Sequence, residues 1–277
     1  MIKIEVHNLK AFENFLMIAG KFVQQGQLVI TKEKSSFYCK NPKEFSTSRL
    51  LLDTNLLTIN KNEEIDLIKI CIRDIIAFRS SISIIDNVEQ VETATLLVEE
   101  FLTTDNEYVG KSIQYKGKTK FKLISVDFQV IEQYISKELS VSLNENWAFN
   151  IDPVRLDIIQ NRTGNIVNVK DDVSVYLYTD DETKNVMVDL NAKHATYVNH
   201  IALPIAEEST GGLPDHMKEV AIHESSFRLM NILRVTDKND LHCAFSEDYN
   251  VFLINSELKQ DSYYIKSRLL ISIIKGK

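Results

Sequence analysis

One pattern constrains this chain more than any other. A short strand that runs directly into an amphipathic helix occurs four times along its 277 residues, twice on each side of a central stretch at 121–147. The four segments read KIEVHNLKAFENFLMIAGKF, IDLIKICIRDIIAFRSSISII, WAFNIDPVRLDIIQNRTGNI and EVAIHESSFRLMNILRV. Alternating, strand-like runs follow each helix, so strands outnumber helices about three or four to one. The sequence therefore predicts an α+β fold with helices on one face of antiparallel sheets.

Helix signals place the four helices at 8–22, 72–85, 152–166 and 224–236. Asn8 suits the N-cap of the first, and Asp152-Pro153 supplies a cap and a first-turn proline for the third. The second helix is expected to begin near Ile72, although its isoleucines also favour strands. Glu224 or Ser225 is expected near the cap of the fourth.

Composition excludes several classes of protein. No apolar run approaches the roughly 18 to 20 residues that span a bilayer, and MIKIEVHN lacks the features of a secretory signal. The three cysteines lie far apart without a CxxC pair, which argues against a disulfide framework or zinc site and for a reducing compartment. We therefore expect a cytoplasmic protein that is not secreted. Richness in Lys, Asn and Ile suggests an AT-rich genome, such as that of a virus or a low-GC bacterium; if the source is a virus, the location is the host cytoplasm.

No arrangement of residues predicts catalysis. The six histidines are scattered without metal-binding spacing, and Asp171-Asp172 and Asp180-Asp181 are adjacent pairs at strand ends, where neighbours point to opposite faces. Gly211-Gly212 lacks the downstream Lys-Ser/Thr of a phosphate-binding loop. We expect no enzymatic activity, no cofactor and no metal site.

Charge is distributed unevenly between the expected helices and the rest of the chain. The whole chain has a net charge of −7, which alone argues against nucleic-acid binding. The four expected helices carry eight cations and five carboxylates, so they total +3 and the rest of the chain −10. Each helix holds two cations: Lys10, Lys21, Arg73, Arg79, Arg155, Arg162, Arg228 and Arg234. This pattern is typical of an electropositive surface on an acidic body, although each cation taken alone fits an ordinary solvated helix surface better.

Two segments resemble a known family. FKLISVDFQVIEQY is similar to the entry into the interdomain connecting loop of DNA sliding clamps of the proliferating cell nuclear antigen type, phage clamps included, and SYYIKSRLLISI is similar to their last strand. The resemblance implies a two-domain sliding-clamp fold with two βαβββ units in each domain. It implies domains at 1–126 and 146–277, joined by a connector at 127–145.

The same resemblance implies a function without turnover. Three chains would form a ring, viral in source, whose helices line a bore that passes duplex DNA and hold it through the eight cations named above, without reading its sequence. DNA polymerase and clamp loader would dock peptides in a groove lined by Leu123, Val126, Phe128, Val130, Ile131, Tyr134, Ile273 and Ile274. The ring would close through edge strands near 108–116 and 173–190, since unpaired edges offer free N–H and C=O groups.

Two other functions remain open from the sequence. The chain could be a monomeric clamp-like viral processivity factor that holds DNA electrostatically beside its polymerase. It could also be a viral structural or assembly protein that binds no DNA. Groove residues could equally pack into the core.

Overall fold

The computed structural model describes most of the chain. Its described residues are 2–22, 24–40, 48–72, 74–80, 94–98, 101–104, 107–110, 112–116, 121–125, 143–164, 172–193, 198–213, 217–223, 226–227, 230–233, 241–246, 250–260 and 262–274. Within them, no helix is long and apolar enough to cross a membrane.

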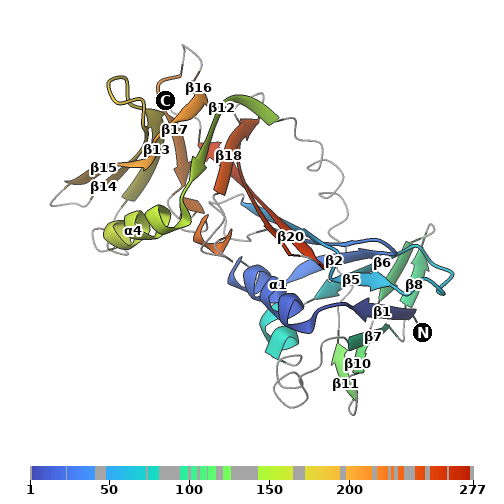
Figure 1. Ribbon diagram of the computed structural model, residues 1–277. Coiled ribbons are helices and arrows are strands. Elements are labelled where there is room, and N and C mark those ends of the chain that lie inside the picture. Colours follow the sequence, from blue (N-terminus) through green and yellow to red (C-terminus); the bar gives the residue numbers. More distant parts are fainter. Residues whose placement is uncertain are drawn as a thin grey trace. The chain divides into compact units, whose positions relative to one another are not determined.

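The chain divides into two compact units (Figure 1). Unit 1 comprises Met1–Lys40, Leu50–Leu139 and Glu257–Ser267, and unit 2 comprises Asn41–Arg49, Ser140–Ser256 and Arg268–Lys277. The expected connector at 127–145 lies outside the described residues except for 143–145, which begin a strand. The domain limits drawn from the sequence therefore stay a prediction.

One sheet of unit 1 has five antiparallel strands in the order β11-β10-β7-β1-β5. These strands are β1 (Ile2–Val6), β5 (Leu57–Ile59), β7 (Ala94–Val98), β10 (Ser112–Lys116) and β11 (Phe121–Ser125). In β1 the buried Ile2, Ile4 and Val6 alternate with the less buried Lys3 and Glu5, as the alternating sequence predicts for a strand with one covered face.

The other strands of unit 1 continue in the order β4-β3-β2-β6-β9-β8. They are β2 (Gly26–Thr31), β3 (Ser35–Lys40), β4 (Arg49–Thr54), β6 (Leu67–Ile72), β8 (Phe101–Thr104) and β9 (Glu107–Gly110). β9 pairs in parallel with β6, and β8 closes a hairpin on β9. Beside β4, the first residues of β20 (Tyr264–Ile274) are fixed by a 2.6 Å hydrogen bond from the Thr54 hydroxyl to the Tyr264 carbonyl.

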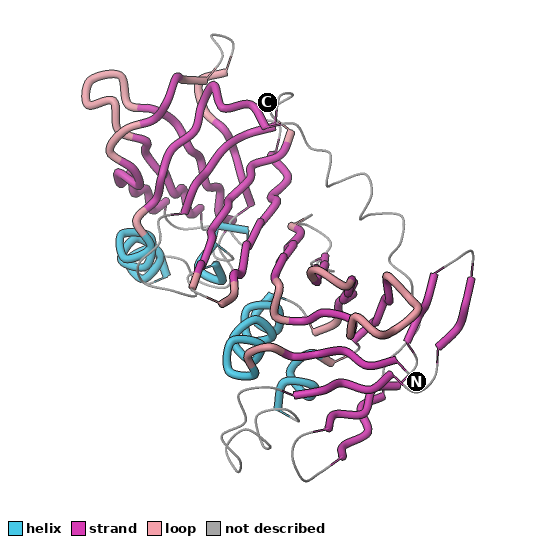
Figure 2. Tube along the Cα trace, turned by 45° about the vertical axis from the view of Figure 1, so that its right-hand side comes forward, coloured by secondary structure: helices cyan, strands magenta, loops and turns pink. Residues whose placement is uncertain are grey.

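Two helices lie side by side in unit 1 (Figure 2). Helix α1 (Leu9–Phe22) begins as predicted, because Oδ1 of Asn8 accepts a 2.9 Å bond from the Ala11 N–H. The second helix covers residues 75–80, where Oδ1 of Asp74 accepts a 2.8 Å bond from the Ala77 N–H. The rings of Phe12 and Phe78 pack edge to face between the two helices.

The expected start of the second helix near Ile72 is wrong. Ile72 is the last residue of β6, where it pairs with Gly26 of β2, and the helix begins only after the Asp74 cap. Pairing between distant strands outweighs the local helical pattern at this position. Residues 81–85 of the predicted helix lie outside the described residues.

Unit 2 contains two groups of antiparallel strands. β12 (Leu143–Ile151) pairs with β18 (Leu241–Ser246) and β16 (Ser209–Gly211), and β18 pairs with β19 (Val251–Lys259). The second group runs in the order β15-β14-β13-β17-β20, with β13 (Asp172–Thr179), β14 (Val186–Lys193), β15 (Val198–Ala206) and β17 (Val220–His223). Stacked rings of Trp147, Phe245 and Phe252 fill the core of the first group.

The helices of unit 2 also lie together (Figure 2). Helix α4 (Pro153–Gly164) confirms the third predicted helix, and Oδ1 of Asp152 caps it by accepting a 2.8 Å bond from the Val154 N–H. The Gln160 amide donates a 2.6 Å bond to the carbonyl of Phe227, which joins α4 to the next helical segment. That segment comprises residues 226–227 and the 3₁₀ helix η1 (Met230–Leu233), while the rest of the fourth predicted helix, including Glu224 and Ser225, lies outside the described residues.

The expected edge strands are also wrong. Residues 112–116 form β10, which pairs with β11 on one side and β7 on the other, and β9 lies between β6 and β8. In unit 2, β13 and β14 are likewise paired on both sides. The strands that lie outermost next to β10 and β14 are instead β11 and β15. The order of strands in a sheet depends on pairing between distant residues, which a local pattern does not encode.

Candidate functional site

Helix α1 presents a partly exposed face that carries two lysines. Its buried stripe comprises Leu9, Ala11, Phe12, Phe15, Leu16, Ile18, Ala19 and Phe22. Lys10 and Lys21 are exposed on the other side of the helix, with Asn14 and Met17 half-buried between them. Neither lysine forms an ion pair with another residue in the part of the chain that the structure describes. Both ammonium groups are therefore available to an external anion.

The helix at 75–80 adds a mixed surface beside α1. A Cβ on Gly20 of α1 would lie 3.5 Å from the Ile76 side chain, an ordinary contact distance, so the two helices lie close together at this point. Ile76 is 58% exposed, and Arg79 is half-buried. Arg73 lies outside the described residues. This helix therefore contributes one described cation of the two predicted.

Helix α4 differs in electrostatic character from α1. The Arg155 guanidinium donates a 2.9 Å hydrogen bond to the Glu207 carboxylate, so its charge is largely balanced. Val154 and Ile158, one turn apart, are 45% and 48% exposed. Arg162 belongs to α4 by its backbone, and Arg228 and Arg234 lie outside the described residues. Among the fully described helix cations, those without an ion pair are thus Lys10 and Lys21 of α1 and the half-buried Arg79, all in unit 1.

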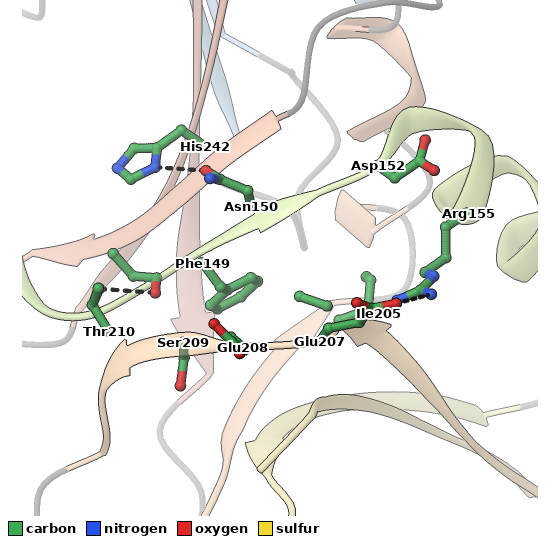
Figure 3. A pocket seen from close by; sticks show the side chains of 12 residues that line it. Phe149, Asn150, Asp152, Arg155, Ile205, Glu207, Glu208, Ser209, Thr210 and His242 are labelled. Carbon is green, nitrogen blue, oxygen red and sulfur yellow. Dashed lines mark hydrogen bonds and ion pairs between the residues drawn. The ribbon is translucent and has the colours of Figure 1, made fainter. Parts of the chain in front are cut away.

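A cavity of about 680 Å³ opens where α4 begins and β15 ends (Figure 3). The Arg155–Glu207 pair forms one side, and the opposite side carries a 3.0 Å hydrogen bond between Nδ1 of His242 and Oδ1 of Asn150. Three carboxylates line the cavity, those of Asp152, Glu207 and Glu208. The Thr210 hydroxyl donates a 3.0 Å bond to the Ala148 carbonyl, which fixes the short strand β16 against β12.

The predicted peptide-groove residues fall largely outside the described part of the chain. Val126, Phe128, Val130, Ile131 and Tyr134 all lie there. Leu123 belongs to β11, and Ile273 and Ile274 end β20. Ile273 is half-buried and pairs with the fully buried Ile222 of β17. Because consecutive strand residues lie on opposite faces of a sheet, one groove can take only one of the two isoleucines.

Sequence reasoning missed the partner of Arg155 and the acidic end of the sheet that contains β15. The turn 180–185 lies beside the end of β15, because Val186 pairs with Ala206. Glu207 and Glu208 follow β15 directly, and Asp180, Asp181 and Glu182 lie in the turn. The two acidic clusters, EE and DDE, are visible in the sequence, but only strand pairing brings them together.

The described residues contain no group of three or more His, Cys, Asp or Glu side chains that could hold a metal ion. Cys39 and Cys243 are fully buried, and burial raises the pKa of both thiols well above the ordinary value. A thiol is a weak nucleophile in this state, because the thiolate is the reactive form.

Among the comparisons with known proteins, only the comparison with solved structures finds matches. No protein-family model matches the sequence, and no curated protein matches it closely enough to be significant. Among solved structures, the A. fulgidus proliferating cell nuclear antigen bound to the C-terminal region of FEN-1 is 11% identical with a TM-score of 0.61, and the match covers 100% of both chains. The PCNA2–PCNA3 complex of Sulfolobus tokodaii matches at 13% identity and TM-score 0.60, over 98% of each chain. The antigen of Entamoeba histolytica matches at 10% identity and TM-score 0.63, over 99% of each chain.

These matches extend over both units and include helices and sheets alike. At 10–13% identity they establish the fold, and they agree with the α+β arrangement predicted from the four strand–helix segments. The chain therefore has the DNA sliding-clamp fold of the proliferating cell nuclear antigen type.

Proposed function

We propose that this protein is a DNA sliding clamp, a ring that encircles duplex DNA and holds a polymerase to its template without catalysing a reaction. The observation that carries the proposal is the match to clamp structures over the whole length of the chain. A fold alone does not specify function, so the surfaces of the molecule must also suit the task.

The exposed face of α1 supports contact with DNA. Lys10 and Lys21 are eleven residues apart, which is about three turns of a helix with 3.6 residues per turn, so they lie on one face. Lysine ammonium groups attract phosphates without reading bases, and a clamp that slides must not bind one sequence tightly. Arg79 and Arg162 extend this surface in the proposal, together with Arg73, Arg228 and Arg234.

Two unpaired strand edges support assembly into a ring. β11 is the outermost strand of one sheet and β15 of another, and within the described residues each has a partner on one side only. We propose that β11 of one copy pairs with β15 of the next, which satisfies the free backbone groups of both. Repeated head-to-tail contacts close into a ring when the rotation between copies is a whole fraction of a turn. We propose three copies per ring, as the resemblance to the clamp family implies.

The connector region is the proposed docking site for partner peptides. The A. fulgidus clamp is bound to the C-terminal region of FEN-1, which is a peptide partner of that protein. By analogy, peptides from a polymerase and a clamp loader would dock near Leu123, the residues 126–134 and the end of β20. The Lys, Asn and Ile content supports a viral source as part of the proposal, with action in the host cytoplasm.

Topological retention on DNA is the test. Linear duplex is incubated with the protein at low salt, its biotinylated ends are then blocked with streptavidin, and an excess of unlabelled duplex is added as a competitor. A closed ring stays on blocked DNA and leaves unblocked DNA by sliding off the ends. A monomer held by charge leaves both equally, because its phosphate contacts exchange freely with those of the competitor. Equal loss would overturn the ring and favour the monomeric alternative, and no binding at low salt would favour the structural-protein alternative.

A further inference from the structure

The two edges proposed to meet between copies carry opposite charges at one end. We infer that the subunit contact is a charge-matched seam, in which the lysines at the start of β11 lie against the acidic end of β15, so that ring closure weakens as salt rises. This inference rests on the proposed ring but is specific to the charges of this chain.

The acidic side of the seam is built from two segments. β15 ends at Ala206, and Glu207 and Glu208 follow it; both are exposed, and Glu207 has a side-chain exposure of 78%. The turn that joins β13 to β14 lies at the same end of the sheet and adds Asp180, Asp181 and Glu182. Asp180 is fixed by Thr183, whose backbone N–H and hydroxyl donate bonds of 2.8 and 2.7 Å to Oδ1.

Cations balance only part of this charge. Arg155 is bonded to Glu207, and Lys184 lies in the turn. Glu208 forms no ion pair within the described part of the chain and faces the cavity next to Phe149 and Ser209 (Figure 3). The end of β15 therefore presents a net negative charge beside an unpaired strand edge.

The basic side of the seam lies at the other unpaired edge. Residues 111–126 contain five lysines and no carboxylate, in a chain whose net charge is −7. The register places Lys122 in β11 opposite Tyr115, and Lys116 in β10 opposite Phe121, so both lysines lie at the end of the hairpin where β11 begins. Residues 117–120, which lie outside the described residues, are not needed for the inference.

Charge decides the direction in which the two edges meet. If β11 added antiparallel to β15, the start of β11 would lie toward Ala206 and the five carboxylates. If it added in parallel, Lys116 and Lys122 would lie toward Val198, where the paired Lys193 and Asp172 have opposite charges and offer no net attraction. Antiparallel addition also continues the pattern of both sheets, because β10–β11 and β14–β15 are antiparallel. Complementary charge at a rim mainly sets orientation and the rate of association.

Charge reversal and charge swapping test the seam. The association of the full-length protein is measured by sedimentation velocity at 50 mM and 500 mM NaCl, for Glu208→Lys, Lys122→Glu and the double variant. Each single reversal is expected to weaken association about ten-fold at low salt, since an attraction is replaced by a repulsion. The double variant restores association, because the pair is re-formed with opposite polarity. Wild-type association is expected to fall as salt rises, since the Debye length shortens from more than 10 Å to a few Å.

A matched control separates the seam from a general effect of charge. Glu64→Lys makes the same change at an exposed loop position of unit 1 and should leave association unchanged. If both single variants associate as tightly as the wild type, or if the double variant stays as weak as the singles, the seam is wrong while the ring stands. If the wild type itself is a monomer at both salt concentrations, the proposed function fails first.

Discussion

The Arg155 guanidinium donates a 2.9 Å hydrogen bond to the carboxylate of Glu207, which follows β15. Arg155 is one of the eight cations that the family resemblance predicted to contact DNA, and in the structure it is paired with a carboxylate. Among the α4 residues whose side chains are described, Val154 and Ile158 are exposed, whereas α1 exposes Lys10 and Lys21. The attraction to phosphate is therefore expected to come unequally from the two units.

Lysine removal from α1 tests this inequality. Lys10→Ala/Lys21→Ala should reduce DNA affinity at low salt and lower the slope of log affinity against log salt by about 0.9 for each phosphate that the variant no longer neutralises. Arg155→Ala should change both quantities far less, because the arginine already has a carboxylate partner. Fluorescence anisotropy with a duplex over a salt series measures both. Equal effects of the two variants would contradict the assignment.

Alanine substitutions at two glycines should change the stability of the protein in opposite directions. A Cβ on Gly26 would overlap the ring of Phe37, which is fully buried, so Gly26→Ala should lower the free energy of unfolding by about 2 kcal/mol. A Cβ on Gly20 would meet Ile76 and Ile75 at 3.5 and 3.6 Å, which is ordinary contact. Gly20→Ala should therefore raise the stability by about 0.5–1 kcal/mol through helix propensity. Urea denaturation measures both, and a destabilised Gly20→Ala would show that the packing of the two helices is tighter than the structure indicates.

The N-cap residues of α1 and α4 should each contribute measurably to the stability of the protein. Asn8→Ala and Asp152→Ala remove the side-chain acceptors of the Ala11 and Val154 N–H groups and should each cost about 1 kcal/mol of stability. Asn161→Ala, at an exposed position within α4, is the control and should cost nothing or stabilise slightly. A cap variant that matched this control would mean that its bond adds no stability.

The hydrogen bonds to Asp180 in the turn at 180–185 should make the stability of the protein depend on pH. The Thr183 backbone N–H, and then its hydroxyl, lower the pKa of Asp180 by bonding to the carboxylate. The folded pKa lies below the unfolded value, so this stabilising contribution is present above the unfolded pKa and is lost as pH falls through the folded pKa. Thr183→Val removes only the hydroxyl and should move the pKa part of the way back up. Carbon-detected NMR titration of Asp180 measures it, and an unchanged pKa would show that the hydroxyl bond is not formed in solution.

Local signals in the sequence predicted local features well. Asn8 and Asp152-Pro153 located two helix starts correctly, because a cap acts within three residues of itself. The same logic failed at Ile72, where the pairing with Gly26, 46 positions earlier in the chain, kept the segment in a strand. The two predicted edges failed for a related reason, because β11 and β15 become outermost only when the whole sheet is assembled.

The candidate site shows the same limit. The spacing of Lys10 and Lys21 sufficed to place them on one exposed face, since both belong to one helix. The pairing of Arg155 with Glu207 could not be seen, because the two residues are 52 positions apart and meet only where α4 begins beside the end of β15. Charge counts along a sequence do not reveal which cations already have partners.

Assembly into a closed ring is the claim on which the other functional statements depend, and mass in solution tests it most directly. Light scattering coupled to size exclusion, at micromolar protein and low salt, should give about 95 kDa, three times the 31.8 kDa of one chain. A mass near 32 kDa under the same conditions would contradict the ring.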